Sequence, residues 1–259
     1  MTHTNIHYVS ALIYSSQDTV GIQGRLEWFR PLLTTGLPMT LFVDSHYYKA
    51  LFASPWFHAA DHPDLNVIPW ELEHSETWRL CCSGETTLPE NRNPKKDNVF
   101  FMALMNAKTE LVARVAAEAT APFIAFLDAG IGKIFRRPAE SFARLRGARI
   151  RKGVSGMLVP GCWAPAPASR ETLAKKICWT FCGGFFVVPR EEAAGLAKAA
   201  MNALSDFVAN GKLTWEVNVW VHMMCLANAP TVNWFKADHD DSMTAIPEEY
   251  LEIGDRPPG

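Results

Sequence analysis

The feature that most constrains the fold is an apolar run that ends in a single carboxylate. Residues from Phe123 to Leu127 are all apolar, and Asp128, Ala129 and Gly130 follow them directly. A continuous apolar run, rather than an alternating one, is typical of a parallel strand that is buried on both faces. Ligands of open α/β sheets bind beyond the carboxyl ends of such strands. Asp128 is therefore the first candidate site residue, although an ordinary turn would also place an Asp here.

Apolar segments along the rest of the chain alternate between the short runs of strands and the 3.6-residue spacing of helices. Strands are predicted at 8–14, 39–43, 65–68, 123–127, 179–189 and 231–235, and helices around 26–32, 47–52, 97–115, after 138, 191–209 and 215–224. Asp97 is predicted to cap the 97–115 helix, and 71–94 and 161–169 are predicted to be loops because of their prolines and glycines. Strands that alternate with helices predict an α/β protein with a mostly parallel sheet.

Composition excludes several classes of protein. The formal net charge of −2 and the lack of a Lys/Arg stripe argue against nucleic-acid binding. Six cysteines without paired CxxC motifs indicate reduced thiols. No basic leader precedes Tyr14 and no apolar run is long enough to span a bilayer, so we expect a cytoplasmic protein with no transmembrane segment, for which peripheral association with the inner membrane stays open.

Four further segments combine residue types that carry chemistry, and each also has an ordinary structural explanation. Lysines 95 and 96, at the start of a predicted helix, fit either an anion site or a solvated helix cap. Gly183 and Gly184, beside two phenylalanines, permit either close approach of a ligand or a β-bulge. Glu216 fits either a general base with a raised pKa or a first-turn carboxylate. Residues 238–242 (Asp-His-Asp-Asp-Ser) fit either a divalent-cation site or a charged turn.

Taken in order, segments 95–98, 127–131, 181–186, 215–220 and 238–242 resemble the HtrL/YibB-like family of bacterial proteins. That family is similar to GT-A-type glycosyltransferases of cell-surface polysaccharide and lipopolysaccharide synthesis. The resemblance runs from the first strand to about residue 242. It implies a single GT-A-like α/β/α sandwich over 1–259, with a nucleotide-binding half (about 1–135), an acceptor-binding half (about 136–245) and a tail (246–259).

The resemblance also implies roles for individual residues. The catalytic residues would be Glu216 and Asp128. The donor-binding residues would be Tyr14, Ser15, Asp44, Lys96, Asp97, Asp128, Gly183 and Gly184, and the acceptor-binding residues Trp215, Glu216 and Trp220. A divalent cation, Mn²⁺ or Mg²⁺, would be held by Asp128 and His239, with Asp241 in reserve. Asp128-Ala129-Gly130 has one carboxylate where the GT-A DxD motif has two, so a metal-free site in which Lys96 or arginines neutralise the leaving diphosphate is the alternative.

The implied activity is transfer of a sugar from a nucleotide-sugar donor, taken as UDP-linked, to a hydroxyl of a cell-surface glycan or lipopolysaccharide. Glu216 would deprotonate the acceptor in an inverting enzyme, or contact the sugar in a retaining one. Two rival hypotheses are a catalytically inactive GT-A-like module that binds a nucleotide or glycan, and a metal-dependent phosphodiesterase that uses the Asp/His cluster.

Overall fold

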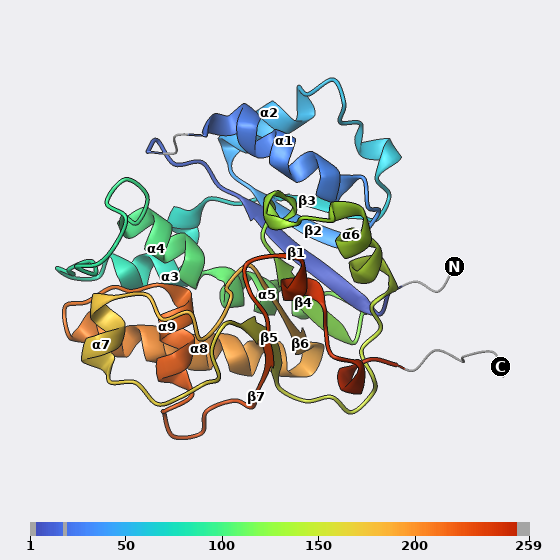
Figure 1. Ribbon diagram of the computed structural model, residues 1–259. Helices are drawn as coiled ribbons and strands as arrows, with labels where there is room; N and C mark the ends of the chain where they lie inside the picture. The colour runs from blue at the N-terminus through green and yellow to red at the C-terminus, as the bar shows by residue number, and fades with distance from the viewer. Residues whose placement is uncertain (1–3, 18–19, 253–259) are drawn as a thin grey trace.

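Strand β4 (Phe123–Leu127) lies in the middle of a seven-stranded sheet and is buried along its whole length, as its apolar run predicts. The computed structural model describes residues 4–17 and 20–252 (Figure 1). In sheet order the strands are β3 (Leu65–Pro69), β2 (Met39–Val43), β1 (Ile6–Leu12), β4, β6 (Phe185–Pro189), β5 (Met157–Gly161) and β7 (Val232–Lys236).

The sheet is mostly parallel, which confirms the predicted α/β class. β3, β2, β1 and β4 run parallel to one another, and β7 runs parallel to β5. β6 is the exception, because it runs antiparallel to both of its neighbours. The chain leaves β5 at the carboxyl edge of the sheet and enters β6 from that same edge. The start of β6 is therefore brought beside the ends of the parallel strands.

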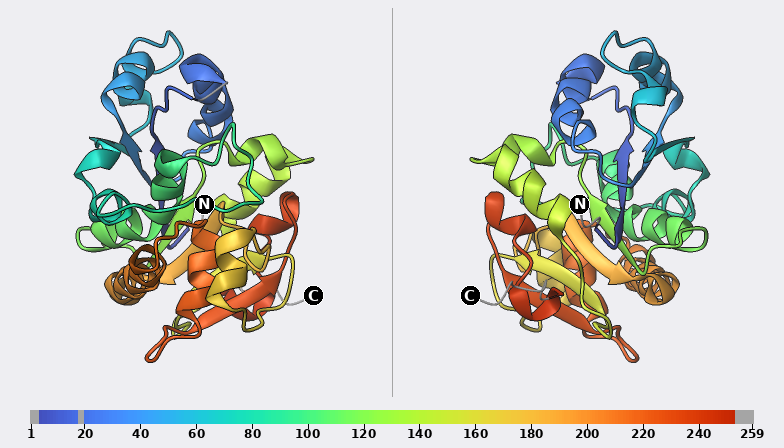
Figure 2. Two further views of the ribbon diagram at one scale, coloured as in Figure 1. Left: turned by 90° about the vertical axis from the view of Figure 1, so that its left-hand side faces the viewer. Right: turned by 90° about the vertical axis from the view of Figure 1, so that its right-hand side faces the viewer.

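Helices cover both faces of the sheet (Figure 1, Figure 2). One face packs against α1 (Gly21–Leu33), α2 (Ser45–Phe52) and α6 (Pro138–Gly147). The other face packs against α3 (Glu76–Cys81), α4 (Val99–Asn106), α5 (Lys108–Ala116), α7 (Arg170–Lys175), α8 (Ala193–Ala209) and α9 (Glu216–Met223). Alternate residues of β4 serve the two cores: Ala125 joins the first and Phe126 the second. This division explains why the β4 sequence does not alternate between apolar and polar residues.

Three elements were not predicted from the sequence. β5 is followed by prolines and itself ends in Pro160-Gly161, a pair that favours a turn. α3 lies inside the segment 71–94 that was predicted to be a loop, and that prediction is wrong. The short helix α7 follows the predicted loop 161–169 and is capped by Ser169, whose hydroxyl accepts a hydrogen bond from the Thr172 amide.

The predicted long helix at 97–115 divides into α4 and α5 at Ala107. Its predicted cap is also wrong, because Asn98 rather than Asp97 caps α4. The Asn98 side chain accepts a hydrogen bond from the Phe101 amide at 2.8 Å, whereas the Asp97 carboxylate accepts one from the Asn93 amide at 2.9 Å. The division matters for the site because it makes Lys108 the first residue of α5.

The chain beyond β7 packs back onto the rest of the molecule as far as residue 252. Leu251 forms a β-bridge with Ile150, and the Arg149 guanidinium lies 2.6 Å from the Glu252 carboxylate. Of the predicted tail, 246–252 is therefore attached to the sheet domain, and 253–259 lie outside the described residues.

Candidate functional site

The direction of the strands brings most of the predicted site residues to one edge of the sheet. β1, β2, β4, β5 and β7 all end there, and β6 begins there. The strand order reverses between β1 and β4, because β2 and β3 continue on one side of β1 and β4 lies on the other. The crevice beyond such a reversal is where open α/β sheets bind ligands. The Ser10 hydroxyl donates a 2.7 Å hydrogen bond to the Leu127 carbonyl and ties these two strands together just below the edge.

A buried lysine between two carboxylates lies beside this crevice. Lys108 Nζ is 3.0 Å from Glu216 Oε1 and 3.2 Å from Asp128 Oδ1, and it donates to the Gly183 carbonyl at 2.8 Å. The three hydrogens of the ammonium group thus have three acceptors. Phe126 lies below it, with Nζ 5.1 Å from the ring centroid. The first residues of two helices and the residue after β4 meet in this cluster, which we call the Lys108 cluster (Lys108, Asp128, Glu216).

The three side chains of the Lys108 cluster differ in exposure. Lys108 is 2% exposed and Glu216 7%, whereas Asp128 is 42% exposed. Burial lowers the pKa of Lys108, but the charges of Asp128 and Glu216 outweigh that effect and raise the pKa above its ordinary value. Lys108 therefore stays protonated, and one cation faces two anions. The carboxylate through which the cluster can contact a ligand is Asp128.

Gly183 and Gly184 are required by the close approach of these carboxylates. A Cβ at Gly183 would lie 2.1 Å from Glu216 Oε1, and a Cβ at Gly184 would lie 3.1 Å from Asp128 Oδ2. The Gly184 carbonyl also accepts a hydrogen bond from the Asp128 amide at 2.9 Å. The predicted double glycine therefore lies beside the predicted carboxylates, and its lack of side chains is what lets β6 begin next to Asp128.

His239 lies on the same edge but faces two thiols. Its Nδ1 is 3.8 Å from Cys162 Sγ and 4.0 Å from Cys182 Sγ, and the Trp179 ring packs edge-on against it at 4.6 Å between centroids. Burial lowers the pKa of His239 more than Asp238, Asp128 and Asp240 raise it. The imidazole is therefore neutral near pH 7 and able to act as a ligand.

The predicted donor residues Tyr14 and Asp44 lie just after β1 and β2, and a hydrogen bond joins them. Asp44 is 2% exposed and its carboxylate accepts hydrogen bonds from the amides of Tyr14, His46 and Tyr47. Asp44 therefore caps α2 and fixes the loop after β1. The Tyr14 ring lies 4.6 Å from the His46 ring, and the Ser15 hydroxyl accepts a 3.3 Å hydrogen bond from the Gln17 amide.

Lys96 and Asp97 lie next to that loop. The Asn98 side chain donates a 2.5 Å hydrogen bond to Gln17 Oε1, which joins the start of α4 to the loop after β1. Asp97 is buried, and Lys96 places its ammonium 4.4 Å from the Phe101 ring centroid. The structure thus brings these two residues to the β1 side of the candidate site.

Three expected site residues have structural roles instead. Trp215 and Trp220 are 5% and 2% exposed and lie in the hydrophobic core, so the expectation that they bind an acceptor is corrected. The Asp241 carboxylate accepts hydrogen bonds from the amides of Arg136 and Arg137 and from the Ser141 hydroxyl. Burial raises the pKa of Asp241, but these hydrogen bonds outweigh it and lower the pKa to about 2.

The residues at the site do not fit a protein cage for Mn²⁺ or Mg²⁺. These hard cations require several oxygen ligands. The Asp241 carboxylate is hydrogen-bonded to the amides at the start of α6, and His239 faces sulfur atoms. One oxygen of Asp128 is paired with Lys108. Asp128 alone remains of the expected oxygen ligands. Of the three expected ligands, Asp128 is therefore the one left for a hard cation, whose other oxygen ligands would have to come from water or a diphosphate.

Sequence reasoning missed Lys108 and the pairing of Cys162 with Cys182. A signal for Lys108 was present, because this lysine lies in the apolar stripe of the predicted 97–115 helix, between Leu104 and Leu111. The two thiols are 20 residues apart, and they meet because β6 starts beside the end of β5.

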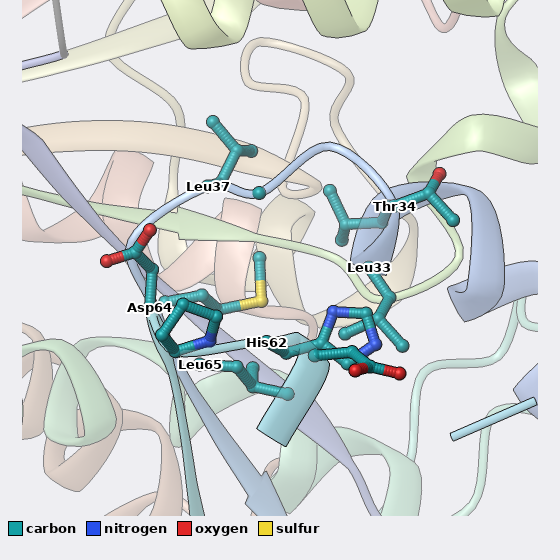
Figure 3. A pocket seen from close by; sticks show the side chains of 11 residues that line it. Leu33, Thr34, Leu37, His62, Asp64 and Leu65 are labelled. Carbon is teal, nitrogen blue, oxygen red and sulfur yellow. The ribbon is translucent and has the colours of Figure 1, made fainter. Parts of the chain in front are cut away.

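Two cavities lie away from this edge. One of about 170 Å³ is formed by the end of α1 and the starts of β2 and β3, at the amino edge of the sheet (Figure 3). Another of about 380 Å³ lies between α7 and the end of α8. Neither cavity is lined by a residue of the Lys108 cluster.

No protein-family model matches this chain, and none of the curated proteins matches it. Within 4–17 and 20–252, no helix combines the length and the apolar character needed to cross a bilayer.

Proposed function

We propose that this protein is a GT-A-type, HtrL/YibB-like glycosyltransferase that moves a sugar from a UDP-linked donor to a hydroxyl of a cell-surface glycan or lipopolysaccharide. The observation that carries the proposal is the Lys108 cluster, with Asp128 exposed at the edge where the strand order reverses. That crevice is the expected position of a nucleotide in an open α/β sheet. The acceptor would place the reaction at the cytoplasmic face of the inner membrane.

Asp128 is the carboxylate that we assign to the substrates. Lys108 pairs with its Oδ1, and the side chain is 42% exposed, so the carboxylate can also accept a hydrogen bond or a proton from a ligand. In the inverting form of the reaction, Asp128 takes the proton of the acceptor hydroxyl while the hydroxyl oxygen bonds to the anomeric carbon. The bond from that carbon to the diphosphate breaks, and its electron pair leaves with the diphosphate. In the retaining form Asp128 contacts the sugar instead, and the anomeric configuration of the product distinguishes the two.

Glu216 takes a different role from the one that the resemblance implies. Its side chain is 7% exposed and its Oε1 is paired with Lys108, so burial keeps it from an acceptor hydroxyl. Glu216 is a positioning residue, because it fixes the ammonium group that in turn fixes Asp128. A donor diphosphate would meet Lys96 and the α4 start instead, since these lie beside the loop after β1.

Two exposed tryptophans replace the buried pair as candidate acceptor contacts. Trp163 is 65% exposed and Trp179 is 42% exposed, and both belong to the segment between β5 and β6 at the carboxyl edge. Trp179 contacts His239, and Lys236 Nζ lies 5.2 Å from the Trp163 ring centroid. A large ring with an apolar face is a suitable surface for the C–H face of a sugar.

Thermal unfolding with UDP, GDP, CMP and dTDP tests the proposal first, because a ligand that binds only the folded state raises the unfolding midpoint. We expect UDP to give the largest rise. Transfer from a panel of UDP-sugars should then be lost in Asp128→Asn and kept in Glu171→Gln, a matched change at an exposed carboxylate. Wild-type turnover in Asp128→Asn, or no nucleotide effect at all, would contradict the proposal.

Asp128-Ala129-Gly130 has one carboxylate where the GT-A DxD motif has two, and this difference favours one second candidate, a catalytically inactive module that binds a nucleotide or glycan. It has the same fold and the same crevice. A midpoint rise with a nucleotide, but no turnover of any donor in the panel, would select it over the glycosyltransferase.

A further inference from the structure

We propose that Cys162, Cys182 and His239, with Asp238 at the fourth position, form a binding site for a thiophilic divalent cation, for which Zn²⁺ is the best match. Among the residues 4–17 and 20–252, Cys162, Cys182 and His239 form a group of three potential ligands whose donor atoms all lie within 4.8 Å of one another. We call them the thiol site. The proposal does not depend on glycosyl transfer.

The spacing of the ligand atoms fits tetrahedral zinc. The two Sγ atoms are 3.8 Å apart, and His239 Nδ1 is 3.8 Å from one and 4.0 Å from the other. Zinc–sulfur bonds of about 2.3 Å and a zinc–nitrogen bond of about 2.0 Å in a tetrahedron place the ligand atoms about 3.5–3.8 Å apart. Small rotations of the side chains would therefore complete the geometry.

Asp238 lies beside two of these three ligands. Its Oδ1 lies 3.7 Å from Cys162 Sγ and 3.9 Å from His239 Nδ1. The same oxygen accepts a 2.8 Å hydrogen bond from the His239 amide, which holds the carboxylate beside the imidazole. Asp238 thus serves either as the fourth ligand or as an outer partner that leaves the fourth position to water.

The ligands are held in place before an ion arrives. The Cys162 amide donates to the Trp179 carbonyl at 3.1 Å, and the Cys182 amide donates to the Pro160 carbonyl at 2.8 Å. Cys182 is fully buried, and the Trp179 ring packs edge-on against His239. Each ligand comes from a different segment at the carboxyl edge, namely the end of β5, the start of β6 and the end of β7. Such preorganisation limits the ordering that binding requires.

The chemistry of the donors selects the ion. Thiolate ligands favour zinc, whereas Mg²⁺ and Mn²⁺ prefer carboxylate, carbonyl and water oxygens. Each thiol would lose its proton to solvent as its bond to zinc forms, and two thiolates balance the charge of the ion. Because zinc would use Nδ1 of His239, the Nε2 nitrogen stays available for a hydrogen bond to another group.

The two thiols have one competing fate, which is a disulfide. Forming it would bring the sulfur atoms from 3.8 Å to about 2.05 Å and would need an oxidant such as hydrogen peroxide, which takes up two electrons and two protons from the thiols and becomes water. A disulfide would leave no thiolate to bind a metal, so the experiment must distinguish disulfide formation from metal binding.

The test is metal titration of the full chain after reduction and removal of metal with a chelator. We expect one equivalent of Zn²⁺ to bind and to raise the unfolding midpoint. Co²⁺ in its place should give the absorption of a tetrahedral ion and a thiolate-to-cobalt charge-transfer band. Cys162→Ser and Cys182→Ser should each weaken zinc binding by at least ~100-fold, because even outer partners of a metal ligand contribute 10–100-fold.

Cys225→Ser is the matched control, since Cys225 is an exposed cysteine outside the thiol site, and it should bind zinc like the unaltered chain. Absence of stoichiometric zinc binding by the reduced protein would overturn the proposal. Equal binding by Cys182→Ser, or a Cys162–Cys182 disulfide that forms in place of a metal complex even under reducing conditions, would overturn it as well.

Asp128→Asn separates this proposal from the proposed function. That variant should lose sugar transfer and keep zinc binding, because Asp128 is not a ligand of the thiol site. Loss of zinc binding in the cysteine variants is measured without any nucleotide. A failure of either proposal therefore leaves the other one open to its own test.

Discussion

Replacing Lys108 by Met should destabilise this protein far more than removing either of its partner carboxylates. Methionine matches the length of the aliphatic stem but supplies no charge and no hydrogen-bond donor. Lys108 is the one cation of its cluster and has three acceptors, Glu216, Asp128 and the Gly183 carbonyl. Removing it leaves two negative charges in place, one of them on a side chain that is 7% exposed.

The expected cost follows from the burial of each partner. Taking one member away from a buried ion pair costs about 3–5 kcal/mol, because the remaining charge is buried without compensation. Nearly all of this cost comes from Glu216, since Asp128 is 42% exposed and can be hydrated. Glu216→Gln, by contrast, leaves Lys108 paired with Asp128 at 3.2 Å and should cost about 1 kcal/mol, the net value of an ordinary hydrogen bond.

Denaturant unfolding followed by circular dichroism measures these differences from the shift in midpoint at constant slope. The double variant Lys108→Met/Glu216→Gln removes both buried charges and should be more stable than Lys108→Met alone. Lys175→Met is the matched control, because the exposed Lys175 pairs with Glu171 at 2.7 Å and its loss should matter little. The reasoning is refuted if Lys108→Met costs under about 1 kcal/mol, the range of ordinary surface changes, or if the double variant is the least stable.

Three further predictions test the fold and the site. Phe126→Ala should cost about 3–5 kcal/mol in the same unfolding assay, because Phe126 is 3% exposed and stacks on Phe186 in the sheet core; a cost as small as that of a surface change would contradict its central position. Gly183→Ala should destabilise the protein and lower turnover, because the added Cβ would lie 2.1 Å from Glu216 Oε1. The control Gly195→Ala, at an open position of α8, should stabilise the protein by about 0.5–1 kcal/mol. Equal effects of the two substitutions on stability would refute the close contact at Gly183. Burial raises the pKa of the Tyr8 phenol, against a smaller lowering by Thr4, so the unfolded chain ionises first and stability should fall as the pH rises above about 10. Tyr8→Phe should show a weaker fall when unfolding is measured on both sides of that pH, and an unchanged fall would refute the assignment.

Much of the fold was predictable because burial on two faces leaves a strong pattern. The β2 and β4 predictions match the observed strands residue for residue, since β4 is wholly apolar, β2 is apolar apart from Thr40, and an aspartate follows each. β5 was not predicted because its five residues end in Pro-Gly, a pair that favours a turn. The antiparallel direction of β6 was not predictable either, because it depends on which edge the long β5–β6 connection follows rather than on the residues of β6.

Candidate residues at strand ends could be predicted, whereas their partners could not. Asp128, Gly183 and Gly184 follow or precede buried strands, and the parallel sheet brings such positions to one edge. Asp44 shares that signal but uses its carboxylate to cap α2, and the Asp241 carboxylate accepts hydrogen bonds from the two amides that precede α6. A sequence shows that a carboxylate is present and not which backbone amides surround it.

Lys108 is the residue whose position argues most directly for function. Its helix stripe offers a core position that Leu or Met would fill with no desolvated charge, and replacing buried ion pairs by apolar residues is often neutral or stabilising. The chain instead buries a lysine, a glutamate beside it and two glycines that make room for the carboxylates. Stability alone does not require this arrangement. Its effect is to hold one exposed carboxylate, that of Asp128, in a fixed orientation at the sheet edge. Departures from local rules of this kind concentrate at functional sites. The free energy of unfolding that Lys108→Met loses therefore also measures how strongly the cluster holds Asp128 in its orientation.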